Sequence, residues 1–418
     1  MKRSPLVVIF TTVFIDLVGF GIVIPVLPYY AEGTAFNATP RTVGLLFASY
    51  SIMQLIFSPV LGGLSDKRGR RPVLLLSIIG TGIGFLVLGF AQSILMLFVG
   101  RILDGITGGN ISTAQAYIAD ITTEENRAKG MGMIGAAFGL GFIFGPAIGG
   151  ILSRWGIQVP FIFAAILCFA NATLLYFTLP ETVTPDHPAK NSATRGRSLR
   201  HVMLSLKQPR LAFVLVIYFL FIVAFSIMTT SFSLYTMFRF GFDAQHTGYL
   251  FAYVGLIAVI IQGGLIGRLV KRFGEMPLVI FGAFCFAISL FAVPFVGPAA
   301  GGLAGLLIGG GVFSMGNSLA TPALTSLASK SVGPEQQGTV LGVTQSTASL
   351  ARAVGPSLAA LLISSSIAHL GADGLPHYMS DRSLFVTFWT GAAIMMLAFL
   401  IAFYYKITSQ TARQGLQG

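Results

Sequence analysis

Three ionisable side chains lie inside long apolar stretches of the sequence. Asp16 stands in one stretch, and Arg101 and Asp104 stand three residues apart in another. An ionisable group in an apolar segment is costly to bury, so it should face a cavity or a partner. A carboxyl group in such a place can bind and release a proton, because burial disfavours its charged form. We therefore take Asp16, Arg101 and Asp104 as candidate proton-coupling residues.

The spacing of these residues suggests how their roles divide. In a helix, Arg101 and Asp104 would share one face and could pair with each other. The neighbouring cation should keep Asp104 charged, which leaves Asp16 as the expected proton carrier. Fixed structural ion pairs that never exchange a proton are the alternative interpretation.

Charged residues also crowd a short turn between two apolar stretches. The turn reads Gly62-Gly63-Leu64-Ser65-Asp66-Lys67-Arg68-Gly69-Arg70-Arg71-Pro72. Asp120 ends a later apolar stretch and should lie at the same level. Contacts between arginine and carboxylate are strong and directional, so we expect a conformational latch formed by Asp66, Arg70, Arg71 and Asp120. Charges that only orient the helices in a membrane are the alternative.

Several polar and aromatic side chains inside apolar stretches could contact a small molecule. Each of them could instead form an interhelical hydrogen bond or pack in a core. For the arginine of this set, pairing across a helix interface and binding of an anionic substrate both remain open. The candidate substrate-binding residues are Gln54, Asn110, Gln115, Tyr218, Phe225, Asn317 and Arg352.

Another apolar stretch carries small residues at helical spacing. It reads Gly141-Phe142-Ile143-Phe144-Gly145-Pro146-Ala147-Ile148-Gly149-Gly150. Small residues let helix backbones approach closely, and proline interrupts the helix hydrogen bonds to make a bend. Generic helix packing would explain the pattern without a functional role. The motif residues singled out here are Gly141, Gly145, Pro146, Gly149 and Gly150.

The composition predicts that these residues belong to a polytopic, all-α membrane protein. Of the 418 residues, 54% are hydrophobic and only 10% are charged, with a mean hydropathy of +0.81. A soluble domain would carry about 25% charged residues. Apolar runs of about 20 residues suit helices that cross a bilayer, whereas barrel strands alternate over about ten residues. Cys168 and Cys285 fall within such runs and should be buried thiols rather than a disulfide.

Twelve transmembrane helices are expected. Most of the 26 lysine and arginine residues fall in segments that share a side with the N-terminus. By the positive-inside rule, both termini should lie in the cytoplasm, and we expect the protein in the plasma membrane. The same rule explains the net charge of +12 without a nucleic-acid partner. The expected spans are 6–28, 42–64, 73–91, 94–118, 130–152, 158–179, 211–236, 247–267, 277–297, 301–327, 339–368 and 383–406.

The chain divides at a polar segment after the sixth span. We expect an N-terminal six-helix half over residues 1–180, a cytoplasmic linker over 181–210, a C-terminal half over 211–406 and a cytoplasmic tail over 407–418. The halves look related, because Gly69 and Pro72 recur as Gly274 and Pro277, and Gly145-Pro146 recurs as Gly355-Pro356. Two pseudo-symmetric halves would place a substrate site between them, near the middle of the membrane.

These motifs carry a family resemblance. The charged turn fits the pattern G-x-L-x-D-[RK]-x-G-R-R-x-x-L and resembles the signature loop between helices 2 and 3 of the major facilitator superfamily. The glycine and proline string resembles the antiporter motif of that superfamily. Together they make the N-terminal half similar to the tetracycline/proton antiporters and related drug:proton antiporters.

The resemblance implies roles for individual residues. It marks Asp16 and Arg101 as coupling residues, Gln54 as a substrate-side residue, and Asp66, Arg70 and Asp120 as the latch. Two features depart from the tetracycline exporters. Those exporters carry an essential acid in span nine, whereas residues 277–297 contain none here, and Asp104 is an additional acid.

The sequence therefore favours a proton-coupled exporter of small amphiphilic compounds that works by alternating access. The alternatives are a symporter or facilitator for a metabolite or organic anion, and a receptor or scaffold that transports nothing. We find no nucleotide loop, metal cluster or nucleophile–base arrangement, so no enzyme, metal site or cofactor is expected, with protons as the coupling ion. The expected partners are the lipid bilayer and a small-molecule substrate, and a monomer is expected.

Overall fold

The computed structural model describes residues 5–33, 36–183, 209–332, 337–363, 369–370, 376–377 and 379–414. Helices dominate these residues, as expected for a chain whose backbone must satisfy its own hydrogen bonds in lipid. The helices of the first half are α1 (Pro5–Glu32), α2 (Pro40–Arg68), α3 (Arg70–Gly89), α4 (Ile94–Thr107), α5 (Asn110–Ile121), α6 (Glu124–Ser153) and α7 (Val159–Thr178).

The second half is built in the same way. Its elements are α9 (Pro209–Phe240), α10 (Ala244–Ile260), the π-helical turn η2 (Ile261–Leu265), α11 (Ile266–Phe273), α12 (Glu275–Ala292), the short 3-10 turn η3 (Val293–Phe295), α13 (Gly302–Lys330), α14 (Gln337–Leu362) and α15 (Asp381–Gln414). A two-stranded antiparallel pair, β1 (His369–Leu370) and β2 (Pro376–His377), precedes α15.

Helix ends coincide with local sequence signals. Thr39 and Ser93 accept hydrogen bonds from backbone amides at the starts of α2 and α4, and Asp243 does the same for α10. Such N-caps satisfy amides that the first turn of a helix leaves free. Gly69 has φ +100°, a conformation that favours glycine, and it lets the chain turn between α2 and α3.

Eleven segments of the described chain are long and apolar enough to cross a membrane. The twelfth long helix, α14, is less apolar and lies alongside α2 and α9 inside the bundle. The expected helical membrane fold is therefore confirmed, with differences in detail. The span expected at 94–118 breaks at Gly108 and Gly109 into α4 and α5, and the span at 247–267 contains the π-helical turn η2.

The ends of several elements also differ from the expected boundaries. The final helix continues through the expected tail to Gln414, and α14 ends at Leu362 rather than at residue 368. Residues 364–368 and most of the expected linker, 184–208, lie outside the described residues.

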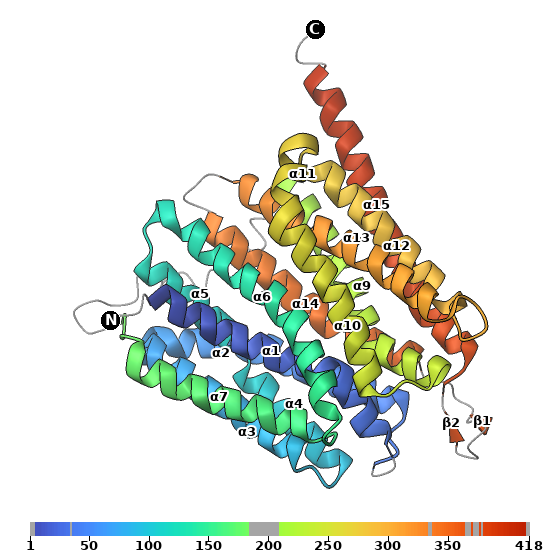
Figure 1. The fold of residues 1–418 in the computed structure, drawn as a ribbon. Coiled ribbons are helices and arrows are strands. Elements are labelled where there is room, and N and C mark those ends of the chain that lie inside the picture. Colours follow the sequence, from blue (N-terminus) through green and yellow to red (C-terminus); the bar gives the residue numbers. More distant parts are fainter. Residues whose placement is uncertain are drawn as a thin grey trace.

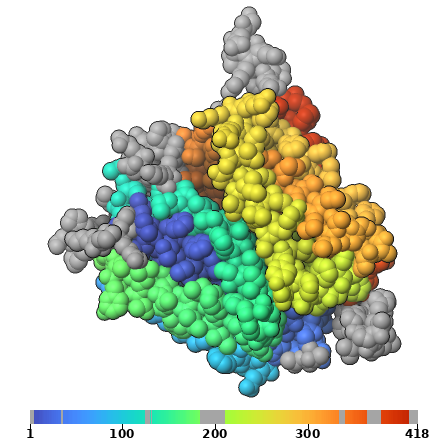
Figure 2. Space-filling view, viewed as in Figure 1, coloured from blue at the N-terminus to red at the C-terminus, as the bar shows by residue number. Residues whose placement is uncertain are grey.

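The two halves share one packing pattern. In the first half, α3 packs against α4 and α7, and in the second half α12 packs in the same way against α13 and α15. Figure 1 shows the first half in blue to green and the second in yellow to red, leaning against each other. The largest contacts between the halves are those of α6 with α10 and of α2 with α14. Figure 2 shows the seam along which α6 meets α10.

Large apolar side chains cover much of the outer surface. Phe177, Leu95 and Ile308 are 78%, 72% and 68% exposed. Exposed apolar surface on this scale would make a soluble protein aggregate, whereas lipid accommodates it. The outer surface is thus suited to a bilayer, and the polar residues considered next lie inside.

Candidate functional site

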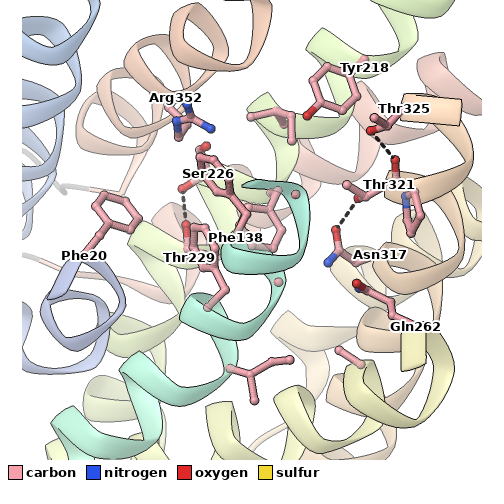
Figure 3. Close-up of a pocket in the computed structure, with 18 of the residues that line it drawn as sticks. Phe20, Phe138, Tyr218, Ser226, Thr229, Gln262, Asn317, Thr321, Thr325 and Arg352 are labelled. Carbon is pink, nitrogen blue, oxygen red and sulfur yellow. Dashed lines mark hydrogen bonds between the residues drawn. The ribbon is translucent and has the colours of Figure 1, made fainter. Parts of the chain in front are cut away.

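A cavity of about 560 Å³ lies between the two halves. Its lining comes from α1, α2, α5 and α6 of the first half and from α9, α10, α13 and α14 of the second (Figure 3). It extends from Phe20 and Ile24 in α1 to Ser329 and Leu341, near the ends of α13 and α14. A volume of this size suits a drug-sized molecule.

Five of the seven candidate substrate-binding residues line this cavity: Gln115, Tyr218, Phe225, Asn317 and Arg352. The other two do not. Gln54 lines a smaller neighbouring cavity of about 50 Å³, which it shares with Gln115, and Asn110 is buried beside Asp16.

Aromatic rings from both halves form one continuous wall of the large cavity. Phe20 and Phe142 lie 5.6 Å apart between ring centroids, and Phe142 lies 5.5 Å from Phe225. Phe225 in turn stacks on Phe313 at 6.0 Å. Edge-to-face and stacked pairs at such distances are favourable arrangements. The sequence singled out only Phe225 of this set, because rings from four helices meet only after folding.

A polar row on α13 lines another side of the cavity. Asn317 and Thr321 are one turn apart, and the Thr321 hydroxyl donates to the Asn317 carbonyl oxygen at 3.1 Å. Thr325 continues the row and donates to the backbone carbonyl of Thr321. Gln262, which also lines the cavity, lies in the π-helical turn η2. Short π-helical turns occur frequently at functional sites.

Arg352 points into the cavity from α14 (Figure 3). Its Nη2 atom donates to Ser349 Oγ at 3.2 Å, and its guanidinium lies 5.5 Å from the centre of the Phe138 ring. In the described part of the chain, no carboxylate pairs with this cation.

The buried ion pair of α4, Arg101 with Asp104, lies beside this cavity. Arg101 Nη1 and Asp104 Oδ2 are 2.8 Å apart, and both side chains are almost completely buried. The Arg101 guanidinium also lies 4.2 Å from the centre of the Tyr50 ring. The sequence correctly placed the pair on one helix face.

Asp16 lies close to this pair but has a different partner. Its Oδ1 atom accepts a hydrogen bond from Asn110 Nδ2 at 3.2 Å, and its carboxyl interacts electrostatically with that of Asp104. Among the described residues, no cation forms an ion pair with Asp16. Arg101 Nη2 and Asn110 Oδ1 have no hydrogen-bond partner in the described part of the chain. Arg101 can therefore donate, and Asn110 accept, one further hydrogen bond at this site.

The helix break between α4 and α5 positions Asn110. A side chain at Gly109 would bring a Cβ within 2.8 Å of Ser58 Cα, so glycine allows α2 to approach the break closely. Asn110 is the first residue of α5, and its side chain reaches Asp16 on α1. Along the chain, only the adjacent Gly108 and Gly109 indicate the break.

Tyr50 connects the Arg101–Asp104 ion pair to the cavity wall. It was not among the candidate residues from the sequence. Gln54 Nε2 donates to the Tyr50 hydroxyl at 2.8 Å and to the carbonyl of Gly108 at 3.0 Å. The Tyr50 ring also lies 5.3 Å from Phe20. The sequence feature that could have indicated Tyr50 is its position one helical turn before Gln54. Gln54 therefore fixes the helix break and Tyr50 rather than facing the large cavity.

The residues of the expected charged turn form a compact ion cluster, although all of them except Gly69 lie in α2 or α3. Arg70 is fully buried and pairs with both Asp66 and Asp120, with 2.9 Å between Arg70 Nε and Asp120 Oδ2. Arg70 also donates to Ser65 Oγ at 2.8 Å. The structure thus brings together three of the four expected latch residues.

Arg71, the fourth, lies outside this ion cluster. Its guanidinium lies 5.0 Å from the centre of the Tyr176 ring and donates to the Tyr176 carbonyl. Its direction follows from the helix, because adjacent residues point to different faces.

Glu181 is a member of the cluster that the sequence analysis did not identify. Its two carboxylate oxygens accept the backbone amides of Arg70 and Arg71 at 2.9 and 3.0 Å. A carboxylate at this place satisfies free amides at the start of α3. The next residue, Thr182, donates to Asp120 Oδ2 at 3.2 Å. The start of the expected linker is therefore held against this ion cluster.

The glycine string packs α6 closely against α1 and α10. A Cβ at Gly145 would lie 2.7 Å from the carbonyl oxygen of Val18, and one at Gly149 would lie 2.8 Å from that of Ile22. Gly141 faces Leu17 in the same way. α6 continues as a helix through Pro146.

Gly150 makes the contact with the second half. A Cβ on Gly150 would lie 2.5 Å from Gly248 Cα, so α6 and α10 touch along their backbones. The string therefore holds together an interface within the first half and one between the halves.

A second tie joins the halves at the end of α1. The Tyr29 hydroxyl lies 2.6 Å from Thr247 Oγ1 and 3.2 Å from Thr236 Oγ1. It also donates to the backbone carbonyl of Ser233 at 3.3 Å. These contacts link α1 with α9 and α10 at the end of the molecule opposite the latch.

Cys168 and Cys285 are buried free thiols. Among the described residues, no group of three His, Cys, Asp or Glu side chains is arranged to hold a metal ion.

Comparison with known proteins agrees with the fold and the motifs. The tetracycline resistance protein of class H from Pasteurella multocida is 31% identical over 417 residues, which covers 99% of this chain and 98% of that protein. Multidrug resistance protein 2 of Bacillus subtilis (strain 168) is 30% identical and covers 86% of this chain and 89% of its own length.

A solved structure has the same fold. The crystal structure of the human organic anion transporter MFSD10 superimposes with a TM-score of 0.68 at 24% identity, covering 96% of this chain and 99% of that one. The sequence profile of the Major Facilitator Superfamily matches residues 9–356. The chain belongs to the Major Facilitator Superfamily of transporters.

Proposed function

We propose that this protein exports small amphiphilic compounds in exchange for protons. The observation that carries the proposal is the group formed by Asp16, Asp104 and Arg101, buried beside the cavity between the halves. Two acids with one cation leave one carboxyl without a counter-charge, which is the arrangement that a reversible proton site needs. The names of the relatives, which refer to tetracycline and multidrug resistance, support the substrate class.

Proton binding changes the forces in this group. When Asp16 is ionised, its charge repels that of Asp104 and competes for Arg101. A proton on Asp16 removes the repulsion and converts its carboxyl from an acceptor into a donor. The unpaired Oδ1 atom of Asn110 is available to accept that donor. The packing of α5 on α1 thereby depends on the proton.

Tyr50 connects this change to the substrate. It contacts Arg101 on one side and Phe20, a cavity-lining residue, on the other. A shift of Arg101 between the two acids would move the Tyr50 ring and hence the aromatic wall. Export then follows from alternating exposure of the cavity at the two membrane faces, with the latch and the Tyr29 tie closing opposite ends.

The proposed setting is the plasma membrane, with both termini and the latch in the cytoplasm. The excess of lysine and arginine on that side supports this orientation. A monomer suffices, since the cavity and the proton site both form within one chain. Protons are the only co-substrate that the proposal requires.

The test uses purified protein in liposomes with an acidic lumen and an alkaline bath. For an antiporter, uptake of the transported compound should be accompanied by proton loss from the lumen, reported by an internal pH dye. A charge-diverse panel of aromatic compounds is added outside, and protein-free liposomes correct for passive trapping of weak bases. Loss of the compound from the lumen together with protons would instead indicate symport. Equilibration of the compound across the membrane without proton movement would indicate a facilitator.

A further inference from the structure

The central cavity carries a charge imbalance. Its described lining contains aromatic rings, hydroxyl groups, amides and one charged side chain, that of Arg352. Neither Asp16 nor Asp104 belongs to this lining: Asp104 is paired with Arg101, and Asp16 accepts a hydrogen bond from Asn110. The charge on Arg352 is therefore left for whatever enters the cavity.

The surroundings of Arg352 do not neutralise it. Its described polar partner is the hydroxyl of Ser349, and its electrostatic neighbours are the phenol groups of Tyr218 and Tyr50, which are neutral at physiological pH. Arg352 is partly buried, and a cation that has lost part of its water is stabilised when an anion pairs with it. The planar guanidinium favours a carboxylate, which can accept two parallel hydrogen bonds.

The remaining walls define the rest of the ligand. Phe138 lies against the guanidinium, and the aromatic wall of Phe20, Phe142, Phe225 and Phe313 continues from both halves. Such rings suit a flat aromatic body. Figure 3 places Asn317 and Gln262 on the side of the cavity away from Arg352, where they can bind a hydrogen-bonding substituent.

We propose that the cavity binds aromatic organic anions, with the anionic group on Arg352 and the ring system against the phenylalanine wall. This inference rests on the proposed export function, because it names the class of compound that the same cavity takes. It distinguishes the chain from an exporter of organic cations, for which the cavity would need an unpaired acid.

Three dansyl compounds with one fluorophore and different charges test the proposal. Dansylglycine is an anion at neutral pH, dansylamide is neutral and dansylcadaverine is a cation. Binding to the purified full-length chain in detergent is followed by the fluorescence change at equilibrium. Dansylglycine should bind at least about tenfold more tightly than either analogue, because only its carboxylate can form a charge-assisted pair with the partly buried guanidinium of Arg352.

Variants assign the preference to Arg352. Arg352→Gln should weaken dansylglycine binding by at least about tenfold and leave dansylamide within about twofold. Arg352→Lys should retain part of the preference, because it keeps the charge but loses the planar fork. Arg154→Gln, which removes a cation beside Trp155 outside the cavity, is the matched control and should change nothing.

The wild-type comparison does not depend on how any variant folds. No dansylglycine binding, equal binding of the three compounds, tighter binding of dansylcadaverine, or a preference that survives in well-folded Arg352→Gln would each overturn the proposal. Proton coupling plays no part in this equilibrium assay. Anion-selective binding without pH-driven transport would refute only the export function, and pH-driven transport with cation selectivity would refute only the anion site.

Discussion

At the scale of the residue, two carboxyl groups of one type have different partners. Asp104 is paired with Arg101 at 2.8 Å, whereas Asp16 accepts a hydrogen bond from an uncharged amide. The charge state of a buried acid follows from its nearest partners. The geometry therefore agrees with Asp16 as the proton carrier and Asp104 as the acid that holds Arg101.

This division predicts different defects for two isosteric substitutions. Asp16→Asn should abolish export driven by a pH gradient and spare downhill exchange, because the residue can no longer bind and release a proton. Asp104→Asn should leave Arg101 without its counter-ion and impair substrate binding and folding more than coupling, since breaking a buried pair strands a charge. Uphill accumulation and counterflow in liposomes separate the two defects.

The opposite pattern would reverse the assignment. If Asp16→Asn keeps full proton-driven transport while Asp104→Asn loses it, Asp104 carries the proton. If both variants are fully active, neither carboxyl does.

At the scale of the element, glycines decide how closely helices approach. Gly145 and Gly149 of α6 meet the backbone of α1, and Gly150 meets that of α10. Other glycines of the same helix, such as Gly135, have no neighbouring atom near the place of a Cβ. The same residue type thus has an interhelical role at some positions of α6 and none at others.

Gly145→Ala should destabilise the protein by about 1–3 kcal/mol, because the added methyl meets rigid backbone. Gly135→Ala is the matched control in the same helix, and it should leave the thermal stability unchanged or raise it, since alanine favours helix over glycine. Thermal unfolding in detergent measures both. Equal melting temperatures for the two variants would show that α1 and α6 do not pack as described.

The junction of α2 and α3 also acts as a unit, through the ion cluster around Arg70. Asp66→Asn should weaken this cluster, favour the state that is open on the latch side and reduce turnover several-fold, since charge-assisted hydrogen bonds are stronger than neutral ones. Substrate affinity should change little, because the cavity lies elsewhere.

Lys67→Gln provides the control for that variant, as it removes an exposed charge from the same turn. Transport rates and labelling of a cysteine placed on the latch side report the two effects. Unaltered rate and accessibility in Asp66→Asn would remove the latch hypothesis.

At the scale of the whole molecule, the two halves are tied together at the end of α1. The end opposite the latch is held by Tyr29 against Thr236, Thr247 and Ser233. Tyr30, its neighbour, donates instead to the carbonyl of Ala91 within the first half. Adjacent tyrosines therefore differ in whether they join the halves.

Tyr29→Phe should shift the population toward the state that is open at this end. Its hydroxyl makes three contacts, each contributing about 0.5–1.5 kcal/mol, so a change of at least about tenfold in the ratio of states is expected. Distance distributions between spin labels on α1 and α10 measure the shift. Tyr30→Phe is the control, and an equal response in both variants would argue against a gate at Tyr29.

The sequence alone determined the membrane environment, the helical fold, the two related halves and the Arg101–Asp104 pair. These follow from local information, namely hydropathy, charge placement and helical spacing. The family motifs also indicated that Asp66, Arg70 and Asp120 belong together, as their ion cluster shows. Their residue types, and their positions at the ends of apolar stretches, can be read along the chain.

Only the tertiary structure decided which of the candidate residues share a site. Gln54 lies at the helix break, and Arg71 faces Tyr176. Glu181 and Tyr50 join clusters that no sequence motif indicated. The aromatic wall, the Tyr29 tie and the lack of an acid in the described lining around Arg352 depend on helices far apart in the sequence. Such contacts are fixed by packing between helices, and hydropathy and spacing along a single helix carry no information about them.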